Sequence, residues 1–378
     1  MDFTKLKMFM DSLDAFDVRC MDVSVHKSHK EVFRYAIGTS DAEGKKPVTP
    51  DNLQWMYSMS KVITCTAVMR LVERGELGLD DKVSKYLPEY ENMLVKRPDG
   101  KITPAENDLL IRHLFSMRSG MTYDLAMTGI LKQKARGKIS TRELVRGMAE
   151  EPLIFEPGTD YNYSLSHDVL AAVAEVITGK TFHEFLRDEI FIPLEIPLDD
   201  IGFHPTEAQK KRFTQKYTYD MEMFRCIPTD MNCAYRLSEE YESGGAGLFA
   251  TLDAYMKIVD ALSCKGIAEN GYKVLSMESI NRMRTNEQTE KETPKMKEGY
   301  GYGLGVRTMM DKKAGRSLGA VGEYGWDGAA CSYTMIDPDN EIAVVLTLHI
   351  CGFGMCYRTI HPKVRNLVYE GLGLATSY

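Results

Sequence analysis

The sequence predicts an α+β fold, in which an antiparallel sheet is flanked by helices from both chain ends and a mainly helical lobe is inserted. Near the start, segments 21–27 and 31–37 alternate in the way that is typical of strands. Near the end, segments 301–309, 331–337 and 341–350 are also predicted as strands, separated by turns. The long stretch between them is mainly helical in pattern. Strands at both ends of the chain therefore predict one interrupted sheet.

The first half of the chain begins with a predicted amphipathic helix over residues 1–17. A polar turn joins the first two strands, and a loop follows. Residues 60–75 predict a helix that ends near Gly75. Segments 77–90 and 109–121 predict further short helical stretches between turns. The apolar positions of the first helix are Phe3, Leu6, Phe9, Leu13 and Phe16.

Helix caps mark the elements that follow. Ser140 and Glu143 form a capping-box pattern, which predicts the start of a helix. Residues 166–180 predict a helix that Gly179 caps at its C-terminus. The later elements are a Gly-rich turn into a strand, a helix and a closing helix, at residues 245–251, 252–263 and 361–373.

The two predicted lobes divide the chain unevenly. We expect residues 1–56 and 235–378 to form an α/β lobe around the central antiparallel sheet. Residues 57–234 should then form the inserted, mainly helical lobe. The active site is expected in the cleft between the two lobes.

The composition is that of an ordinary globular protein, with 44% hydrophobic and 27% charged residues. The net charge of −7, with both signs interspersed, argues against nucleic acid or an anionic membrane as the main partner. No run of about 18 apolar residues occurs, so no membrane span is expected. The N-terminal segment carries acidic residues and no long apolar stretch. It does not predict a signal peptide, and we expect a cytoplasmic location.

The eight cysteines are scattered and form no C-x-x-C pair. Without a secretion signal, this pattern favours free thiols in a reducing compartment. The eight histidines show no H-E-x-x-H or similar spacing. The sequence therefore predicts no metal site, and no cofactor is expected.

The segment "WMYSMSKVIT" places Ser58 and Lys61 three residues apart where a helix begins. Side chains at this spacing share one helix face, so the lysine amine can reach the serine hydroxyl. A serine becomes a useful nucleophile when a base takes its proton, and N–H groups at a helix N-terminus favour a developing oxyanion. Alone, the pattern is also consistent with an N-cap serine and a solvated lysine. Ser60 does not fit the role, because adjacent side chains diverge on a helix.

Two further segments carry candidate groups. Tyr163 lies just before a predicted helix, and its phenol could join the proton-transfer system; the alternative is a core aromatic residue. The segment 326–328 leads into a strand. The first N–H of that strand, that of Ala329, could be an oxyanion donor beside the Ser58 N–H. The alternative for this segment is a plain turn with a packing tryptophan.

Together these segments resemble the serine β-lactamase-like hydrolases: class C β-lactamases, DD-peptidases and family VIII carboxylesterases. The resemblance covers nearly the whole chain in the right order. It implies a β-lactamase/transpeptidase-like fold, with Ser58, Lys61 and Tyr163 as catalytic residues. The segments that carry it are "SMSK", "LLIRHLFSMRSGM", "FEPGTDYNYSLSHDVLAAVAEVITGK", "GGAGLFATLDAYMKIVDAL" and "GYGLGV".

Departures from the class C pattern favour family VIII carboxylesterases and related acyltransferases. Where class C enzymes have Y-x-N, this chain ends the tripeptide with Leu165, so the amide that would contact a β-lactam side chain is missing. Where they have K-T-G, this chain has Trp-Asp-Gly at 326–328, so the cation for a β-lactam carboxylate is missing too. Asp327 could bind a cationic group of the substrate, or could point away.

The sequence therefore predicts a serine hydrolase that forms an acyl-enzyme, namely a carboxylesterase or transesterase for small to mid-sized acyl esters. The alternatives are an amidase, D-aminopeptidase or weak β-lactamase on the same scaffold, and a non-catalytic binding or sensor protein. The expected partner is a small-molecule ester or amide. We expect the substrate to be bound by Tyr123, Leu165, Trp326, Asp327 and Gly328.

Three of the candidate residues have other interpretations. Tyr123 could equally pack in the core. His167 could act as a base. Because it follows the motif on the helix, a structural or solvent-facing role is expected instead. Cys331 lies near the proposed oxyanion strand and is a candidate for reaction with thiol reagents.

Overall fold

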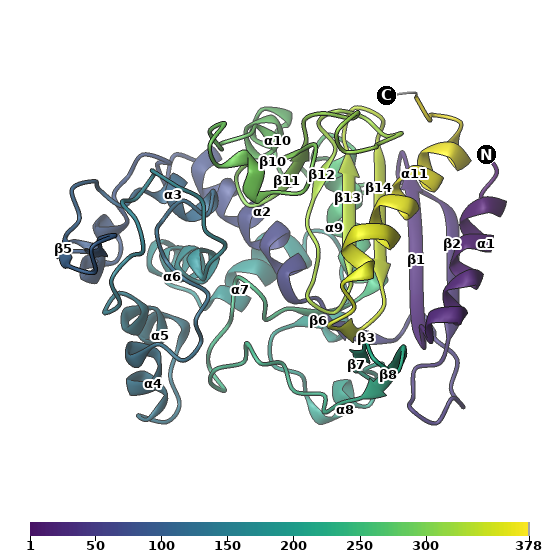
Figure 1. Cartoon of the computed structure of the whole chain (residues 1–378), viewed down its shortest axis with the longest axis horizontal. Helices are drawn as coiled ribbons and strands as arrows, with labels where there is room; N and C mark the ends of the chain where they lie inside the picture. The colour runs from purple at the N-terminus through teal and green to yellow at the C-terminus, as the bar shows by residue number, and fades with distance from the viewer. Residues whose placement is uncertain (377–378) are drawn as a thin grey trace.

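The computed structural model describes residues 1–376, apart from the side chain of Pro294, and contains the predicted antiparallel sheet (Figure 1). Seven strands form it in the order β10-β11-β12-β13-β14-β1-β2, so strands from both ends of the chain meet where β14 pairs with β1. These strands are β1 (Cys20–Lys27), β2 (Lys30–Gly38), β10 (Tyr300–Tyr302), β11 (Arg307–Met309), β12 (Tyr324–Gly325), β13 (Tyr333–Asp337) and β14 (Ile342–Thr347).

Helices cover both faces of this sheet, as the alternation along β14 requires. Val344 faces α1 (Thr4–Ser12) and α11 (His361–Leu372), which cover one face and come from the two chain ends. Val345, the next residue, packs in the cluster that includes α9 (Leu252–Ser263). Figure 1 shows α11 in front of the sheet and α9 behind it. Because both faces are covered, β13 and β14 are buried along their whole length.

The helical part of the chain is arranged around α2 (Ser60–Glu73), which is buried along almost its whole length. Helix α6 (Ser166–Thr178) packs against it, and Gly179 caps α6 in the left-handed conformation, as predicted. Ser140 forms the predicted capping box. The other helices are α3 (Ile111–Phe115), α4 (Thr128–Lys134), α5 (Thr141–Met148), α7 (Phe182–Leu186), α8 (Glu207–Lys210) and α10 (Met277–Arg284).

Smaller sheets join distant segments. β3, β9 and β6 form a sheet that draws on all three predicted segments of the chain, whose division at residues 57 and 234 stays a prediction. β7 and β8 form a hairpin that was not predicted, and β15 adds to it in parallel. These strands, with the pair β4–β5, are β3 (Leu53–Trp55), β4 (Leu94–Lys96), β5 (Ile102–Pro104), β6 (Ile201–Gly202), β7 (Tyr217–Asp220), β8 (Arg225–Pro228), β9 (Phe249–Thr251) and β15 (Ile350–Cys351).

Two predicted strands are wrong in extent. Segment 301–309 forms two strands, because the Gly303 N–H donates to Val306 O at 2.8 Å and turns the chain back on itself. Segment 341–350 is interrupted after β14, where His349 has a φ of 57°. The two interruptions are turns of four and two residues within apolar runs, so periodicity alone does not reveal them.

No helix among the described residues combines the length and the apolar composition needed to cross a membrane. The cytoplasmic location stays a prediction.

Two buried carboxylates hold the start of α7. Glu175 accepts a hydrogen bond from the Phe182 N–H at 3.0 Å, and Glu242 accepts one from the His183 N–H at 2.5 Å. Burial raises the pKa of each carboxyl to about 7, and at Glu242 the nearby Glu175 adds to the effect. The start of this helix is therefore sensitive to pH.

We expect the Glu242→Gln variant to gain stability relative to wild type as the pH rises from 5 to 8. The folded-state pKa of Glu242 lies above its ordinary value, so its contribution is fully present below about pH 4.5 and is lost as the pH rises through about 7. The difference in unfolding free energy should move by about 1–3 kcal/mol toward the variant. Urea denaturation at both pH values measures it.

The matched control is Glu239→Gln, because Glu239 is an exposed carboxylate three residues away, paired with Lys138 on the surface. Its difference from wild type should stay nearly constant with pH. If both variants showed the same pH dependence, the burial of Glu242 would not be its cause.

Candidate active site

Ser58 lies in a one-turn 3-10 helix, Tyr57–Met59, between β3 and α2. The turn enters at Tyr57, a non-glycine residue with a φ of 47°, a strained conformation that must be held by its surroundings. Tyr255 from α9 holds it from the other side, donating from its hydroxyl to Met59 O at 3.0 Å. Ser60 is buried, and its hydroxyl accepts from the Leu248 N–H at 3.1 Å. Ser58, which is only half buried, is thus the serine that faces solvent.

Lys61 is completely buried in the first turn of α2. Its amine donates to Gly245 O at 2.6 Å and lies 3.4 Å from both Ser58 Oγ and the Tyr123 hydroxyl. The same amine lies 4.7 Å from the centre of the Tyr163 ring. No carboxylate among residues 1–376 lies within 4.0 Å of it. The amine is therefore aimed at Ser58 by a carbonyl and by aromatic rings.

Three aromatic rings form a stack beside this pair. Tyr163 lies parallel to Tyr123 at 5.3 Å and near-parallel to Trp326 at 5.6 Å. The Tyr163 oxygen accepts a hydrogen bond from Trp326 Nε1 at 3.1 Å. Burial and the neighbouring Tyr163 raise the pKa of Tyr123 well above its ordinary value. The tyrosine hydroxyl within reach of Lys61 is thus that of Tyr123, whereas Tyr163 presents its ring to the amine.

The segment at 326–330 lies against the Ser58 turn. A Cβ on Gly328 would stand only 2.5 Å from Met56 O, so this close approach requires glycine. Ser332 tightens it by donating to the same oxygen at 3.3 Å. Ala329, the next residue, is exposed and lines the same cavity as Ser58. The fold therefore brings the two predicted oxyanion donors to one place.

The cavity above Ser58 has a volume of about 530 Å³, of the size that suits a small-molecule ligand. Its walls carry six aromatic side chains, and its two lysines are partly exposed, whereas Arg307 is buried. The lining includes Tyr123, Tyr161, Tyr163, Tyr235, Trp326, Tyr357, Met296, Lys295 and Lys297.

Known proteins resemble this chain in sequence and in fold. The pattern of the Beta-lactamase family matches residues 9–353. The chain belongs to the Beta-lactamase family. It is 28% identical to esterase EstB of Burkholderia gladioli, over 88% of this chain and 86% of EstB. It is 27% identical to a lovastatin esterase of Penicillium rubens, over 82% of this chain and 80% of that protein.

Solved structures share the fold. EstCE1, described as a hydrolase with promiscuous acyltransferase activity, superposes with a TM-score of 0.79 at 24% identity, over 95% of this chain and 96% of EstCE1. The simvastatin synthase LovD of Aspergillus terreus superposes with a TM-score of 0.80 at 18% identity, over 98% of each chain. The predicted β-lactamase/transpeptidase-like fold is confirmed.

One predicted substrate contact of this Beta-lactamase family member is wrong, and another is already paired within the chain. Leu165 is buried in the helical core as the N-cap residue of α6 and does not line the cavity above Ser58. Asp327 borders the cavity, but its oxygens accept from Arg307 at 2.8 Å and from Lys297 at 2.5 Å. Although burial raises the pKa of Asp327, these two cations lower it well below its ordinary value. The carboxylate is thus already paired within the chain.

Sequence patterns did not identify Asp168 and Gly245 as site residues. Asp168 is completely buried and accepts from the Tyr241 hydroxyl at 2.5 Å and from Ser243 Oγ at 2.6 Å. A Cβ on Gly245 would lie 2.6 Å from Asp168 Oδ2 and 3.4 Å from Lys61 Nζ. Gly245 thus fits tightly between the carboxylate and the amine. The only sequence signal for Asp168 was an acidic residue within an apolar helix. No signal pointed to Gly245, because nothing in the order of residues shows that it lies beside Lys61.

The remaining candidates are buried. His167 donates from Nε2 to Phe115 O at 3.1 Å, and burial lowers its pKa to about 3. Its imidazole is therefore neutral and part of the core. Cys331 is also fully buried, which removes the access that a thiol reagent needs.

Proposed function

We propose that this protein is a serine carboxylesterase or transesterase for small to mid-sized acyl esters, with Ser58 as the nucleophile. The observation that carries the proposal is the meeting of Ser58, Lys61 and the Ala329 segment at one aromatic-lined cavity. Esterases among the sequence relatives support the same chemistry.

The acylation step uses groups on both sides of Ser58. Lys61 Nζ takes the hydroxyl proton as Ser58 Oγ attacks the ester carbonyl carbon. The N–H groups of Ser58 and Ala329 stabilise the oxyanion that forms. The tetrahedral intermediate then collapses, the bond to the leaving alcohol breaks, and that alcohol takes up a proton.

We infer that Tyr163 delivers this proton. Its oxygen accepts from Trp326 Nε1, so its own O–H is free to point into the cavity, and the tryptophan N–H would stabilise a transient phenolate. The proton that Lys61 took from Ser58 then passes through the Tyr123 hydroxyl, 3.4 Å from the Lys61 amine, to the Tyr163 phenolate, so all three groups return to their starting states. Water then attacks the acyl-enzyme in hydrolysis, or a second alcohol attacks it in transesterification.

The cavity favours an ester over a β-lactam. Its aromatic walls suit an apolar acyl group, whereas its two nearest lysines are engaged, Lys297 with Asp327 at 2.5 Å and Lys295 with Asp160 at 2.6 Å. A β-lactam carboxylate would have to compete with these carboxylates for a cation.

A substrate panel tests the proposal. Initial rates with p-nitrophenyl acetate, butyrate and octanoate are compared with the rate of nitrocefin cleavage. We expect ester turnover that depends on chain length and at least tenfold slower nitrocefin cleavage. Fast nitrocefin cleavage would favour the β-lactamase alternative. No turnover of esters, together with no labelling by a fluorophosphonate, would favour a non-catalytic protein.

A further inference from the structure

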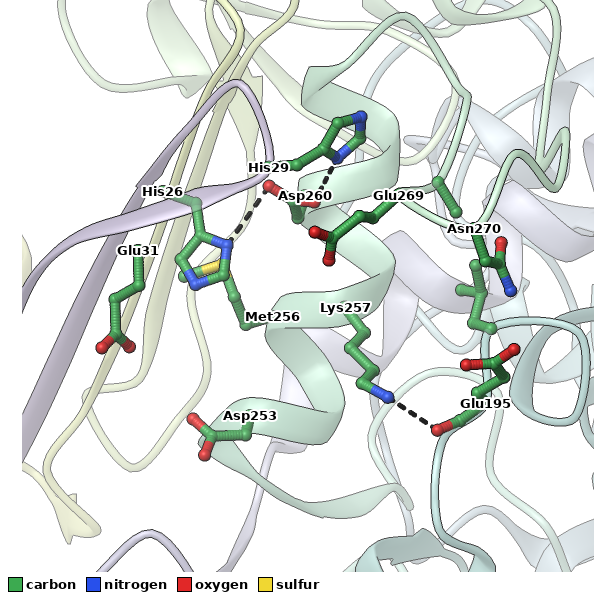
Figure 2. Close-up of a pocket in the computed structure, with 12 residues that line it drawn as sticks. His26, His29, Glu31, Glu195, Asp253, Met256, Lys257, Asp260, Glu269 and Asn270 are labelled. Atoms are coloured by element: carbon green, nitrogen blue, oxygen red, sulfur yellow. Dashed lines mark hydrogen bonds and ion pairs between the residues drawn. The ribbon is translucent and has the colours of Figure 1, made fainter.

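A second cavity, of about 500 Å³, lies away from Ser58 between the β1–β2 hairpin and α9 (Figure 2). None of the residues that line it lines the cavity above Ser58. Carboxylates outnumber cations around it. Asp253 pairs with Arg34 at 2.5 Å, whereas Lys257 donates to Glu195 O at 2.6 Å and has no carboxylate of the described residues within 4.0 Å. The carboxylates around it are Glu31, Glu195, Asp253, Asp260 and Glu269. A cavity of this charge attracts cations.

Two histidines meet one carboxylate in this cavity. His26 Nδ1 lies 3.2 Å from Asp260 Oδ1, and His29 Nδ1 lies 2.7 Å from Asp260 Oδ2 (Figure 2). Cys264 is the C-cap residue of α9, four positions after Asp260. The ligand atoms of His29, Asp260 and Cys264 all lie within 4.8 Å of one another.

The fold holds these groups in place from two sides. His29 occupies the two-residue turn between β1 and β2, with a φ of 67°, so the hairpin fixes its position. Asp260 is buried on α9, which packs against the sheet, and Cys264 is buried just after the end of that helix. Since 231 residues separate His29 from Asp260, the cluster exists only in the folded chain.

We propose that His29 Nδ1, Asp260 Oδ2 and Cys264 Sγ bind a divalent transition metal ion of the zinc class. Imidazole, carboxylate and thiolate are the ligands that zinc takes in proteins. At metal distances of about 2.0–2.3 Å, tetrahedral ligand atoms stand roughly 3.3–3.8 Å apart. The contact between His29 and Asp260 would open by about half an ångström, and the thiolate would close by up to about 1 Å. A water molecule completes the fourth position, which the partly exposed His29 leaves open to solvent.

His26 is a positioning residue in this arrangement. Its Nδ1 donates to the second oxygen of Asp260, which orients the carboxylate and leaves Oδ2 for the metal.

Binding exchanges protons for the metal. The Cys264 thiol loses its proton to solvent as the metal–sulfur bond forms, and His29 carries its proton on Nε2 instead of Nδ1. The carboxylate and the thiolate then balance the two charges of the ion. Burial and the neighbouring Asp260 raise the pKa of the Cys264 thiol, so protons compete with the metal. Affinity should fall as the pH is lowered from 7.5 to 5.5.

The test uses the full chain, freed of metal with a chelator and titrated with Co²⁺. We expect one Co²⁺ per chain, with a thiolate-to-cobalt charge-transfer band and strong visible bands of a tetrahedral site. Cys264→Ser should lose the charge-transfer band. His29→Gln and Asp260→Asn should weaken binding by roughly 100-fold, and His26→Gln by roughly tenfold. Cys351→Ser is the matched control and should keep the band, because Cys351 is the cysteine of residues 1–376 that is not fully buried.

A second measurement guards against variants that do not fold. Zinc should raise the Tm of wild type but not that of His29→Gln, with both chains shown to be folded by circular dichroism. A charge-transfer band that persists in Cys264→Ser would overturn the proposal. So would the absence of saturable binding to folded wild type, which would leave only a hydrogen-bond network. Neither measurement depends on ester turnover, so failure here is distinct from failure of the proposed function.

Discussion

Ser58→Ala is expected to lower kcat/KM for p-nitrophenyl butyrate by roughly 10³-fold or more, because it removes the atom that forms the acyl-enzyme. The fold should be unaffected. Ser58 is half buried, and its hydroxyl has one long contact, 3.4 Å to Lys61, so its loss leaves no strong hydrogen bond broken. Purified wild type and variant are compared by initial rates and by thermal unfolding.

Ser60→Ala is the matched control for this experiment. Ser60 lies two residues away in the same motif, but its hydroxyl is buried and accepts from the Leu248 N–H. We expect it to keep its reaction with a fluorophosphonate and to lose about 1 kcal/mol of stability, the typical contribution of one such hydrogen bond. Labelling of Ser58→Ala at wild-type speed would contradict the assignment of the nucleophile.

Lys61→Met should be nearly as damaging as Ser58→Ala, with a loss of roughly 10³-fold in kcat/KM, because no other side chain of the described residues offers an amine to Ser58 Oγ. The effect should fall on kcat, since Lys61 is buried beneath Ser58 and does not line the cavity. Methionine matches the length of lysine without its charge. Steady-state kinetics on an ester series measures both parameters.

Stability separates the chemical role of Lys61 from a structural one. The amine is fully buried and has no carboxylate of residues 1–376 within 4.0 Å, so replacing it by an apolar side chain should leave the Tm unchanged or raise it. A variant that lost activity only because it unfolded would show a lowered Tm. Activity within tenfold of wild type would mean that another group takes the Ser58 proton.

Much of the fold is predictable because burial imposes periods on the sequence. The alternation of β1 and β2 and the caps at Ser140 and Gly179 are local signals, and the structure contains each of them. The two interruptions at 303–306 and 348–349 lie inside apolar runs, so neither the strand period nor the helix period of the apolar residues is broken there. The strands of the β7–β8 hairpin are only four residues long, so the alternation of buried and exposed residues along β7 is too short to be a clear signal.

In the candidate site, too, contacts between residues close in sequence could be predicted and contacts between distant residues could not. Ser58 and Lys61 could be recognised together, because side chains three positions apart on a helix lie close to each other whatever the rest of the chain does. The contacts of Tyr123, Tyr163 and Asp327 could not be recognised, because each is made with a residue at least 20 positions away.

By itself, the sequence determined the order of elements, the interrupted antiparallel sheet and the Ser58–Lys61 pair, since all of these follow from spacing along the chain. Tertiary structure alone decided that Tyr123 reaches the Lys61 amine, that Arg307 and Lys297 take up Asp327, and that Leu165 is turned into the core. It also brought His29 to Asp260. Hydrogen bonds and ion pairs act over a few ångströms in space, and that distance is set by packing rather than by separation in sequence.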